Sequence, residues 1–329
     1  MIREMIKKLF NDDAGVSPII ATLVLIVVAI AGAAAVGVLM GSFSSDVSSS
    51  SSSEGAANGA STELLIAGST TVQPVSEVLA EAFMRENQGV KVTVQGGGSG
   101  AGISSTEMDI VDIGAASEDV DTVTTHPKLQ QHQIGASGVV LIAKGVTSTT
   151  VVTPQEVKNL YNNVSSTGTV SAATANTAAG LTAAAPITVY QREESSGTEE
   201  TFSKWASNSK TWMDDTNATG ASGNAGVLKA VEGSSCAIGF VDFGFAEGST
   251  SATLLDVGAG TSATTVKAEI LKALKGESST FPAGLTRPLN YLTNGAPSTL
   301  EQSFIDFARQ PAQDALFDEV GYFSMIDIS

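Results

Sequence analysis

An arginine stands beside small hydroxyl and glycine residues in the segment QREESSGTEETF, residues 191–202. Arg192 is followed by Ser196, Gly197 and Thr198, an order typical of a loop that opens a helix. The first turn of a helix leaves backbone N–H groups without partners and carries a partial positive charge, so it suits a small anion. A guanidinium adds a permanently charged fork that matches two oxygens of a tetrahedral oxyanion. The segment therefore indicates either an ordinary helix cap or half of an anion site.

Three further segments place small or polar residues directly after a short apolar run. A glycine-rich loop lets backbone N–H groups converge on a ligand, and hydroxyls add further donors. Each segment alone is weak evidence for a binding site, because a GSTT turn, for example, is usually a helix cap. The glycine-rich loop is not a Walker loop, because no GK[ST] follows the glycines. The candidate residues are Thr70 and Thr71 in GSTTVQP (68–74), Ser99 in GGGSGAG (96–102), and Glu118 with Asp119 beside it, after Ser117 in GAASEDV (114–120). Together with Arg192 they predict a site for a small oxyanion.

Alternating apolar runs and helix-spaced segments indicate the elements that would position these residues. We expect strands in ELLIAG, KVTVQ, DIVDIGAAS, GVVLIAKG, PITVYQ and CAIGFVDF, and helices in PVSEVLAEAFMREN, PQEVKNLYNN, EETFSKWAS, VKAEILKALKG and TLEQSFIDFARQPAQDALFDEVG. GVVLIAKG has no polar alternation, which is typical of a strand in a parallel sheet covered on both faces. The alternation of strands and helices predicts an α/β fold with mostly parallel sheets, whose ligands bind beyond the carboxyl ends of the strands.

The order of these motifs resembles the phosphate-binding protein family of Pst-type ABC importers. The G-x-[ST]-[ST]-x-x-P turn of that family appears at residues 68–74, its Q-G-x-G-S-G-x-G loop at 95–102, and its D-x-G-A-S-[DR] segment at 112–118 with one extra small residue. Its R-x-x-S-S-G-T segment appears at 192–198, and IGFVDF, RPLNYLTNG and FIDFARQPAQDALFDEVGYFSM complete the match. The resemblance covers nearly all of residues 63–329 and implies a two-lobed periplasmic-binding-protein-like fold.

Carried over by position, the resemblance implies a phosphate site divided between two lobes. The implied phosphate-binding residues are Thr70, Thr71 and Ser99 from the first lobe and Arg192, Ser196, Gly197 and Thr198 from the second. Glu118, or Asp119 next to it, stands where the family often has an acid that accepts a proton from hydrogen phosphate. Such a carboxylate repels sulfate, which has no proton to give at neutral pH. Because neither lobe alone satisfies the anion, binding should draw the lobes together.

The resemblance also implies how the body is divided and what it works with. Lobe one is expected at residues 63–138 and 284–329 and lobe two at residues 139–283, with GVVLIAKG and TRPLNYL crossing between them. The implied partners are inorganic phosphate and an ABC permease with its ATPase. We expect no enzyme activity, since the two histidines lie together and far from any nucleophile pattern.

The first sixty residues predict a membrane anchor. Residues 16–45 carry no charge, and about twenty apolar residues suffice to span a bilayer, so we expect a transmembrane helix at 16–43. Basic residues before it place the body outside the cell. The stretch DDAGVSPIIATLVLI resembles the type IV pilin-like (class III) signal of archaeal surface proteins, which implies that a prepilin-type peptidase removes a leader at residues 1–15. Residues 44–62, rich in Ser and Gly, read as a flexible linker.

Composition excludes several other classes of function. With 17 Lys and Arg against 34 Asp and Glu, the net charge of −17 argues against nucleic acid and anionic lipid as partners. The single cysteine, Cys236, excludes an intrachain disulfide and is expected in a buried strand. His126 and His132 share the polar stretch THPKLQQHQ, which favours a solvated helix or loop over a metal site.

Several readings of function stay open at this point. The leading one is a membrane-tethered extracellular protein that captures phosphate and delivers it to an ABC importer. A second is a pilin-like filament or adhesion subunit, because the N-terminal helix resembles a pilin signal. A third keeps the binding role and changes the anion to sulfate or molybdate. A phosphoester hydrolase ranks lowest, because the sequence shows no metal cluster or activated nucleophile.

Overall fold

The computed structural model describes residues 62–194 and 196–329. The described residues lie in the compact unit Ala60–Ser329. The predicted leader, the predicted membrane-spanning helix at 16–43 and all but the last residue of the predicted linker lie outside them. Among the described residues, no helix is long and apolar enough to cross a bilayer.

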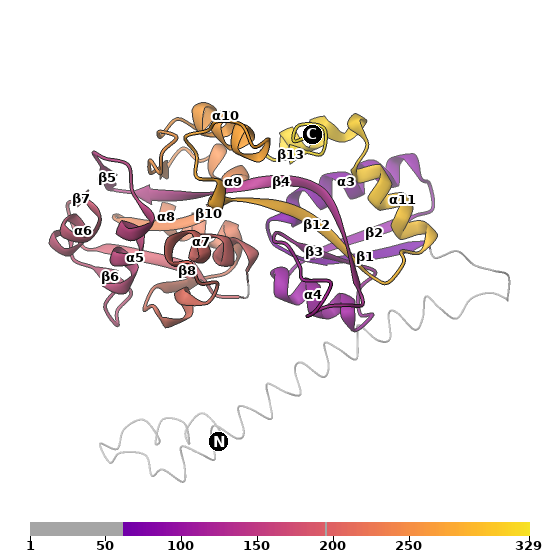
Figure 1. Cartoon of the computed structure of the whole chain (residues 1–329), viewed down its shortest axis with the longest axis horizontal. Coiled ribbons are helices and arrows are strands. Elements are labelled where there is room, and N and C mark those ends of the chain that lie inside the picture. The colour runs from indigo at the N-terminus through magenta and orange to yellow at the C-terminus, as the bar shows by residue number, and fades with distance from the viewer. Residues whose placement is uncertain (1–61, 195) are drawn as a thin grey trace, which may run out of the picture. The chain divides into compact units, whose positions relative to one another are not determined.

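The first lobe is a sheet flanked by helices, at the indigo and yellow end of the body in Figure 1. Its strands run in the order β2 (Lys91–Gly96), β1 (Glu63–Gly68), β3 (Ile113–Ala116), β12 (Thr286–Asn294) and β4 (Leu129–Lys144), and β13 (Phe323–Ser324) also pairs with β4. Its helices are α3 (Val72–Glu86), α4 (Ser99–Glu107), α11 (Thr299–Ala308), η3 (Pro311–Gln313) and α12 (Asp314–Glu319). The core of this lobe joins Ile66 of β1 and Leu79 of α3 to Phe304 of α11.

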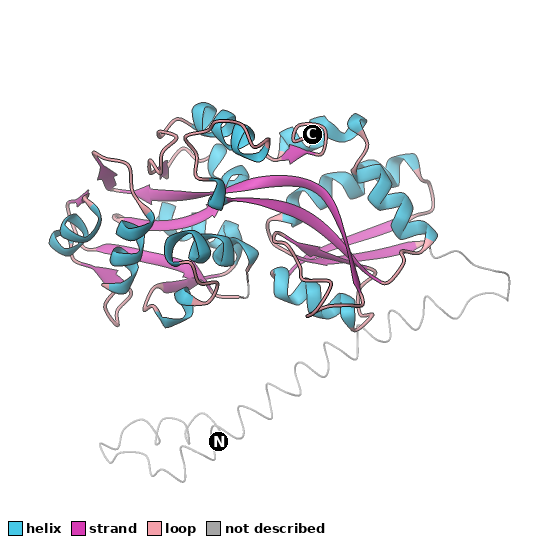
Figure 2. Cartoon of the chain, in the orientation of Figure 1, coloured by secondary structure: helices cyan, strands magenta, loops and turns pink. Residues whose placement is uncertain are grey.

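The second lobe is built around a second group of strands (Figure 2) and has its own core. From β4 the strand order continues through β10 (Ala237–Asp242), β8 (Ile187–Arg192) and β6 (Thr169–Val170), with β9 (Thr219–Ala221) on β8, β11 (Thr253–Leu254) on β4, and a separate pair of β5 (Val146–Ser148) and β7 (Leu181–Ala183). Its helices are α5 (Pro154–Asn162), α6 (Ala172–Ala179), α7 (Gly197–Ser207), η1 (Trp212–Asp215), α8 (Gly223–Gly233), α9 (Phe243–Glu247), α10 (Ala263–Leu274) and η2 (Ala283–Leu285). Phe202 of α7 stacks on Phe240 of β10 in this core. Cys236 is buried, as expected, but it lies immediately before β10 and not in the strand.

Strands β4 and β12 cross between the lobes (Figure 1). β4 pairs with β12 as far as Gly138 and with β10 from Val139 onward, so one strand belongs to both sheets. The expected lobe boundary at residues 138 and 139 falls at this change of partner. It stays a prediction, because Ala60–Ser329 forms one compact unit.

The expectation of mostly parallel sheets is wrong for these crossing strands. β1 pairs in parallel with β2 and β3, and β8 pairs in parallel with β10 and β9. β4, however, is antiparallel to β12 and to β10, and β12 is antiparallel to β3. The chain enters lobe two along β4 and returns along β12, and strands that run in opposite directions pair antiparallel. The sheets are therefore mixed.

The polar stretch before GVVLIAKG is also different from its expected form. β4 begins at Leu129, so His132 lies in a strand and not in a solvated helix or loop. Its Nε2 lies 3.1 Å from Thr293 Oγ1 on β12. Residues 130–133 (QQHQ) are polar and at least partly exposed, so the start of β4 does not show in a hydropathy pattern. His126 lies outside β4 and its Nδ1 lies 3.0 Å from Glu107.

Candidate functional site

Three loops of lobe one bring hydroxyls to the same edge of its sheet. β1, β2 and β3 run parallel, so their carboxyl ends meet where Ser69 follows β1, Ser99 opens α4 and Ser117 follows β3. Ser69 Oγ donates to Ser117 Oγ at 2.9 Å, and the Ser117 N–H donates to Ser99 Oγ at 3.2 Å. Gly68 allows this close approach, because its φ is +139° and a Cβ there would lie 2.3 Å from the carbonyl oxygen of Ala115.

Lobe two presents the start of a helix to this edge. Arg192 ends β8, and Ser196 caps α7 by accepting hydrogen bonds from the N–H groups of Thr198 and Glu199. Gly197 begins the helix and is buried. A Cβ at Gly197 would lie 2.8 Å from the hydroxyl oxygens of both Ser99 and Ser117. A side chain there would therefore collide with lobe one.

Hydrogen bonds cross between the lobes at this point. Thr71 Oγ1 lies 3.1 Å from Thr198 Oγ1, and the Gly197 N–H donates to Ser99 Oγ at 3.3 Å. Arg192 Nη2 donates to Thr70 Oγ1 at 2.7 Å. The structure thus brings together seven of the eight residues named from the sequence, Thr70, Thr71, Ser99, Arg192, Ser196, Gly197 and Thr198.

Arg192 carries donors without partners in the middle of this cluster. Its side chain is fully buried and forms an ion pair with Glu194, yet Nε and Nη1 have no hydrogen-bond partner among the described residues. Burial lowers the pKa of Arg192 from its usual value, and the charge and hydrogen bond of Glu194 counteract that shift. A buried guanidinium donor without a partner is costly, and these two atoms are able to donate to a ligand that accepts hydrogen bonds.

The glutamates around Arg192 are held away from the open donors. Glu194 also accepts the N–H of Gly223, and Glu199 accepts the backbone N–H of Arg192 at 2.9 Å. Glu200 forms an ion pair with Lys210 at 2.8 Å. Glu194 is therefore engaged by Nη2 of Arg192 itself, Glu199 by the Arg192 backbone, and Glu200 by Lys210.

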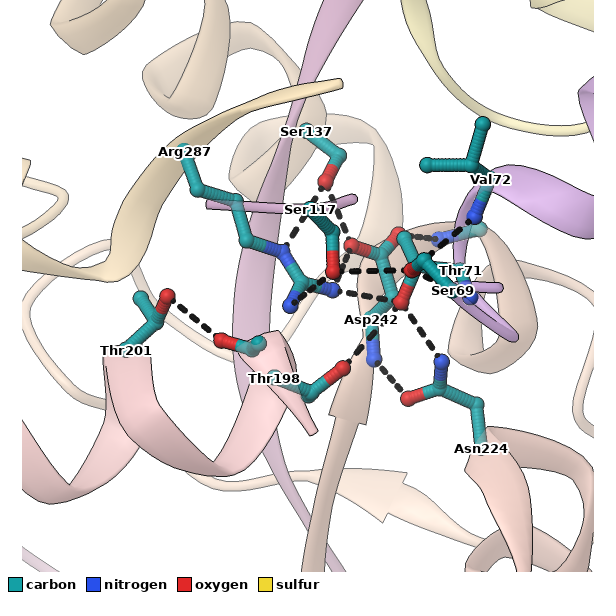
Figure 3. Close-up of polar contacts among 12 residues, drawn as sticks. Ser69, Thr71, Val72, Ser117, Ser137, Thr198, Thr201, Asn224, Asp242 and Arg287 are labelled. Atoms are coloured by element: carbon teal, nitrogen blue, oxygen red, sulfur yellow. Dashed lines mark hydrogen bonds and ion pairs between the residues drawn. The ribbon is translucent and has the colours of Figure 1, made fainter. Parts of the chain in front are cut away.

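A second buried arginine lies behind the hydroxyls, and sequence reasoning missed its role. Arg287 of β12 forms an ion pair with Asp242 at 2.7 Å (Figure 3). The same guanidinium donates to Thr71 Oγ1 at 2.8 Å and to Ser117 Oγ at 3.2 Å. Asp242 also accepts a hydrogen bond from Ser137 of β4. Arg287 thus connects the crossing strand to loops of both lobes.

Glu118 does not join the hydroxyl cluster. Its carboxylate lies 3.2 Å from Lys210 Nζ, and it shares a hydrogen bond with Glu200 of the other lobe. Burial, together with the hydrogen bond and charge of Glu200, raises its pKa from 4.5 to about 7 against the opposing effect of Lys210. Asp119 accepts a hydrogen bond from Gln131. Neither acid contacts the hydroxyls, and Ser117 lies there instead.

Two cavities flank the cluster, and both are lined by residues of the two lobes. One, of about 400 Å³, is lined by Glu118, Lys210 and Arg287 among others. The other, of about 650 Å³, is lined by Thr70, Glu194 and Asn224 among others. Across residues 62–194 and 196–329, no group of three or more His, Cys, Asp or Glu could hold a metal ion.

Residues 51–311 match the PBP superfamily domain. The chain belongs to the PBP superfamily. It is 26% identical over 273 residues to the phosphate-binding protein PstS of Bacillus subtilis, covering 82% of this chain and 83% of that protein.

Two solved structures have the same fold. One, from Clostridium perfringens, is described as a phosphate ABC transporter substrate-binding protein with bound phosphate, with 24% identity, a TM-score of 0.63 and coverage of 80% of this chain and 99% of that one. The other is an ABC-type phosphate transport receptor from Vibrio cholerae, with 22% identity, a TM-score of 0.57 and coverage of 79% and 99%. At these identities the two structures establish the two-lobed architecture.

Proposed function

We propose that this protein captures inorganic phosphate between its two lobes and delivers it to an ABC importer. The observation that carries the proposal is the pair of buried, unpartnered donors of Arg192, a side chain whose Nη2 contacts Thr70 at a cluster of hydroxyls contributed by both lobes. A guanidinium fork and several hydroxyls suit a tetrahedral oxyanion. The proteins from Bacillus, Clostridium and Vibrio that share the fold are all named for phosphate binding or transport, which supports phosphate as the anion.

The bound anion would stabilise the contact between the lobes. Lobe one contributes Thr70, Thr71 and Ser99, and lobe two contributes Arg192 and the start of α7, including Ser196, Gly197 and Thr198. An anion held by groups of both lobes favours the arrangement in which those groups meet, by the difference in affinity between open and closed forms. Closure around β4 and β12 would then report the loaded state to a permease.

The cellular setting is part of the same proposal. The uncharged stretch at residues 16–43 would tether the protein to the membrane with its body outside, after a prepilin-type peptidase removes the leader. The ABC permease and its ATPase would then lie in the same membrane. Fractionation of cells and protease treatment of intact cells test this arrangement, and a body protected from external protease would count against it.

Isothermal titration calorimetry tests the binding role directly. The full-length protein is titrated with phosphate, with sulfate and molybdate as competing anions and with chloride as the control for ionic strength. We expect saturable one-to-one binding of phosphate. An absence of any heat or change in melting temperature with phosphate would refute the proposal. Filaments built of this chain on the cell surface would instead favour the pilin-like alternative.

A further inference from the structure

The hydroxyl groups of the site have a fixed direction of hydrogen bonding. A hydroxyl oxygen has two lone pairs and one proton, so a hydroxyl that already accepts two hydrogen bonds can only donate. Thr71 Oγ1 accepts from Arg287 Nη2 at 2.8 Å and from Asn224 Nδ2 at 2.8 Å (Figure 3). The orientation of the Asn224 amide is itself set, because its Oδ1 accepts the backbone N–H of Asp242 at 3.0 Å. The proton of Thr71 therefore points away from these donors.

Two serines are constrained in the same way. Ser117 Oγ accepts from Arg287 Nη1 at 3.2 Å and from the hydroxyl of Ser69 at 2.9 Å. Ser69 is the donor in that pair, because its own oxygen accepts the N–H groups of two residues at the start of α3. Ser99 Oγ accepts the N–H of Ser117 at 3.2 Å and that of Gly197 at 3.3 Å. Thr71 is consequently the donor toward Thr198 Oγ1. Ser99 and Ser117, whose Oγ atoms lie 3.4 Å apart, likewise have only their protons left to give.

The buried carboxylates beside this cluster are occupied by cations and N–H groups. Asp242 accepts from Arg287, from Ser137 and from the N–H of Gly244. Glu194 is held by Arg192 and by the N–H of Gly223. Among the described hydroxyls of the cluster, those of Thr70 and Thr198 keep acceptor capacity, and both are neutral.

We infer that this site recognises the unprotonated oxygens of a tetrahedral oxyanion rather than an acidic proton on it, with Ser117 and Arg287 as the residues that determine this specificity. The inference rests on the proposed function and names the property by which that site selects its anion. Where a carboxylate would accept the proton of hydrogen phosphate, the chain places a serine whose lone pairs are filled by an arginine and a second serine. Sulfate, which has no proton to donate, should then compete with phosphate.

The ratio of phosphate affinity to sulfate affinity distinguishes a site that accepts the proton of hydrogen phosphate from one that only donates to its oxygens. A site built to bond a ligand hydroxyl rejects the analogue that lacks it by about 10⁴-fold. A neutral hydroxyl acceptor such as Thr198 contributes about one ordinary hydrogen bond, or about tenfold. A preference for phosphate below about a hundredfold therefore supports the inference.

Competition calorimetry on the full-length protein measures this preference. Phosphate is titrated at pH 8 into wild-type protein with and without sulfate, and chloride at matched ionic strength is the control. A phosphate preference under about a hundredfold supports the inference, and a larger preference overturns it while leaving the proposed function intact. An absence of phosphate binding would refute the proposed function itself.

The variant Ser117→Asp tests the residue assignment. It adds a carboxylate that can accept the proton of hydrogen phosphate. We therefore expect the preference for phosphate over sulfate to rise at least about tenfold over wild type. Ser104→Asp, exposed on α4, adds the same charge away from the cluster and should leave the preference unchanged. Melting curves establish that each variant is folded. A folded Ser117→Asp protein with the wild-type preference would overturn the assignment of Ser117, and the wild-type competition decides the inference even if that variant does not fold.

Discussion

Thr71 of lobe one and Thr198 of lobe two meet hydroxyl to hydroxyl, with 3.1 Å between their Oγ1 atoms. Thr71 is the N-cap of α3 and Thr198 is the second residue of α7, so the starts of two helices face each other across the site. Each helix start carries a partial positive charge. Two such ends repel when they approach without a counter-charge, so an anion between them favours the contact of the lobes.

Replacing Thr71 with valine tests this contact with little change of shape. The variant loses the hydroxyl that contacts Thr198, removes the acceptor of Asn224 Nδ2 and takes one of several acceptors from Arg287, which keeps Asp242. We expect phosphate affinity, measured by calorimetry, to fall about tenfold or more. Thr93→Val, on β2 and outside the cluster, controls for the exchange itself. Equal affinities of the two variants would contradict a role for the Thr71 hydroxyl.

Arg192→Ala should remove measurable phosphate binding. The change deletes the donors that lack partners and leaves the half-buried Glu194 without its cation. Breaking a buried pair costs about 3–5 kcal/mol, which corresponds to a loss of affinity of at least about a hundredfold if it falls on binding. The double variant Arg192→Ala/Glu194→Ala separates stability from binding, because it removes the unpaired carboxylate. We expect its melting temperature to recover while phosphate binding stays absent.

The matched control for this series is Arg309→Ala. Arg309 is exposed at the end of α11 and its removal also subtracts one positive charge. Calorimetry should give the wild-type affinity for this variant. If Arg309→Ala weakens binding as much as Arg192→Ala does, the effect belongs to overall charge, and the assignment of Arg192 is wrong.

The sequence predicted which residue types lie at the site and at which helix and strand ends they lie. Gly197 and Thr198 lie at a helix start, as the Ser-Gly-Thr order predicts, and Arg192 ends the strand before it. The loops of Thr71 and Ser99 meet because parallel strands bring their carboxyl ends to one edge. These features depend on residues that are close together in the sequence, so a sequence pattern can predict them.

The rest of the site depends on contacts between distant parts of the chain. Arg287 lies 216 residues from Thr71 in the sequence. Its burial results from the path of β12 behind the loops, which a local sequence pattern does not predict. Glu118 carries the acid that a motif alignment favours, yet the extra small residue in GAASE places Ser117 at the cluster and turns Glu118 toward Lys210. A charged residue inside an otherwise uncharged strand, as in TRPLNYL, is the signal that could have pointed to Arg287.

A methyl group at Gly197 should prevent the lobes from meeting around an anion. The added Cβ would lie 2.8 Å from the oxygens of Ser99 and Ser117, closer than such atoms approach, so one lobe must shift. We expect Gly197→Ala to lose phosphate affinity by about a hundredfold, and small-angle scattering should show no compaction when phosphate is added. Gly233→Ala is the control, because nothing lies within 4 Å of a Cβ at that position in α8.

The free energy of unfolding should depend on pH through the titration of Glu118. Burial raises the pKa of this carboxyl from 4.5 to about 7, so the native state holds the proton more tightly than the unfolded chain does. The stabilisation that follows is fully present below pH 4.5 and is lost as the pH rises to about 7. Burial also raises the pKa of Glu199 to about 7, and that carboxyl acts in the same direction.

Glu118→Gln should therefore flatten the fall in stability between pH 5 and pH 7 without abolishing it. We expect the loss of unfolding free energy over this window to shrink by an amount on the order of 1 kcal/mol, because the amide stays neutral throughout and Glu199 still titrates. Urea denaturation in phosphate-free buffer at several pH values measures the change. Asp119→Asn, exposed and next in the chain, removes one carboxylate outside the contact with Lys210 and Glu200. If Asp119→Asn flattens the pH profile of the unfolding free energy as much as Glu118→Gln does, the assignment of this pH dependence to the carboxyl of Glu118 is wrong.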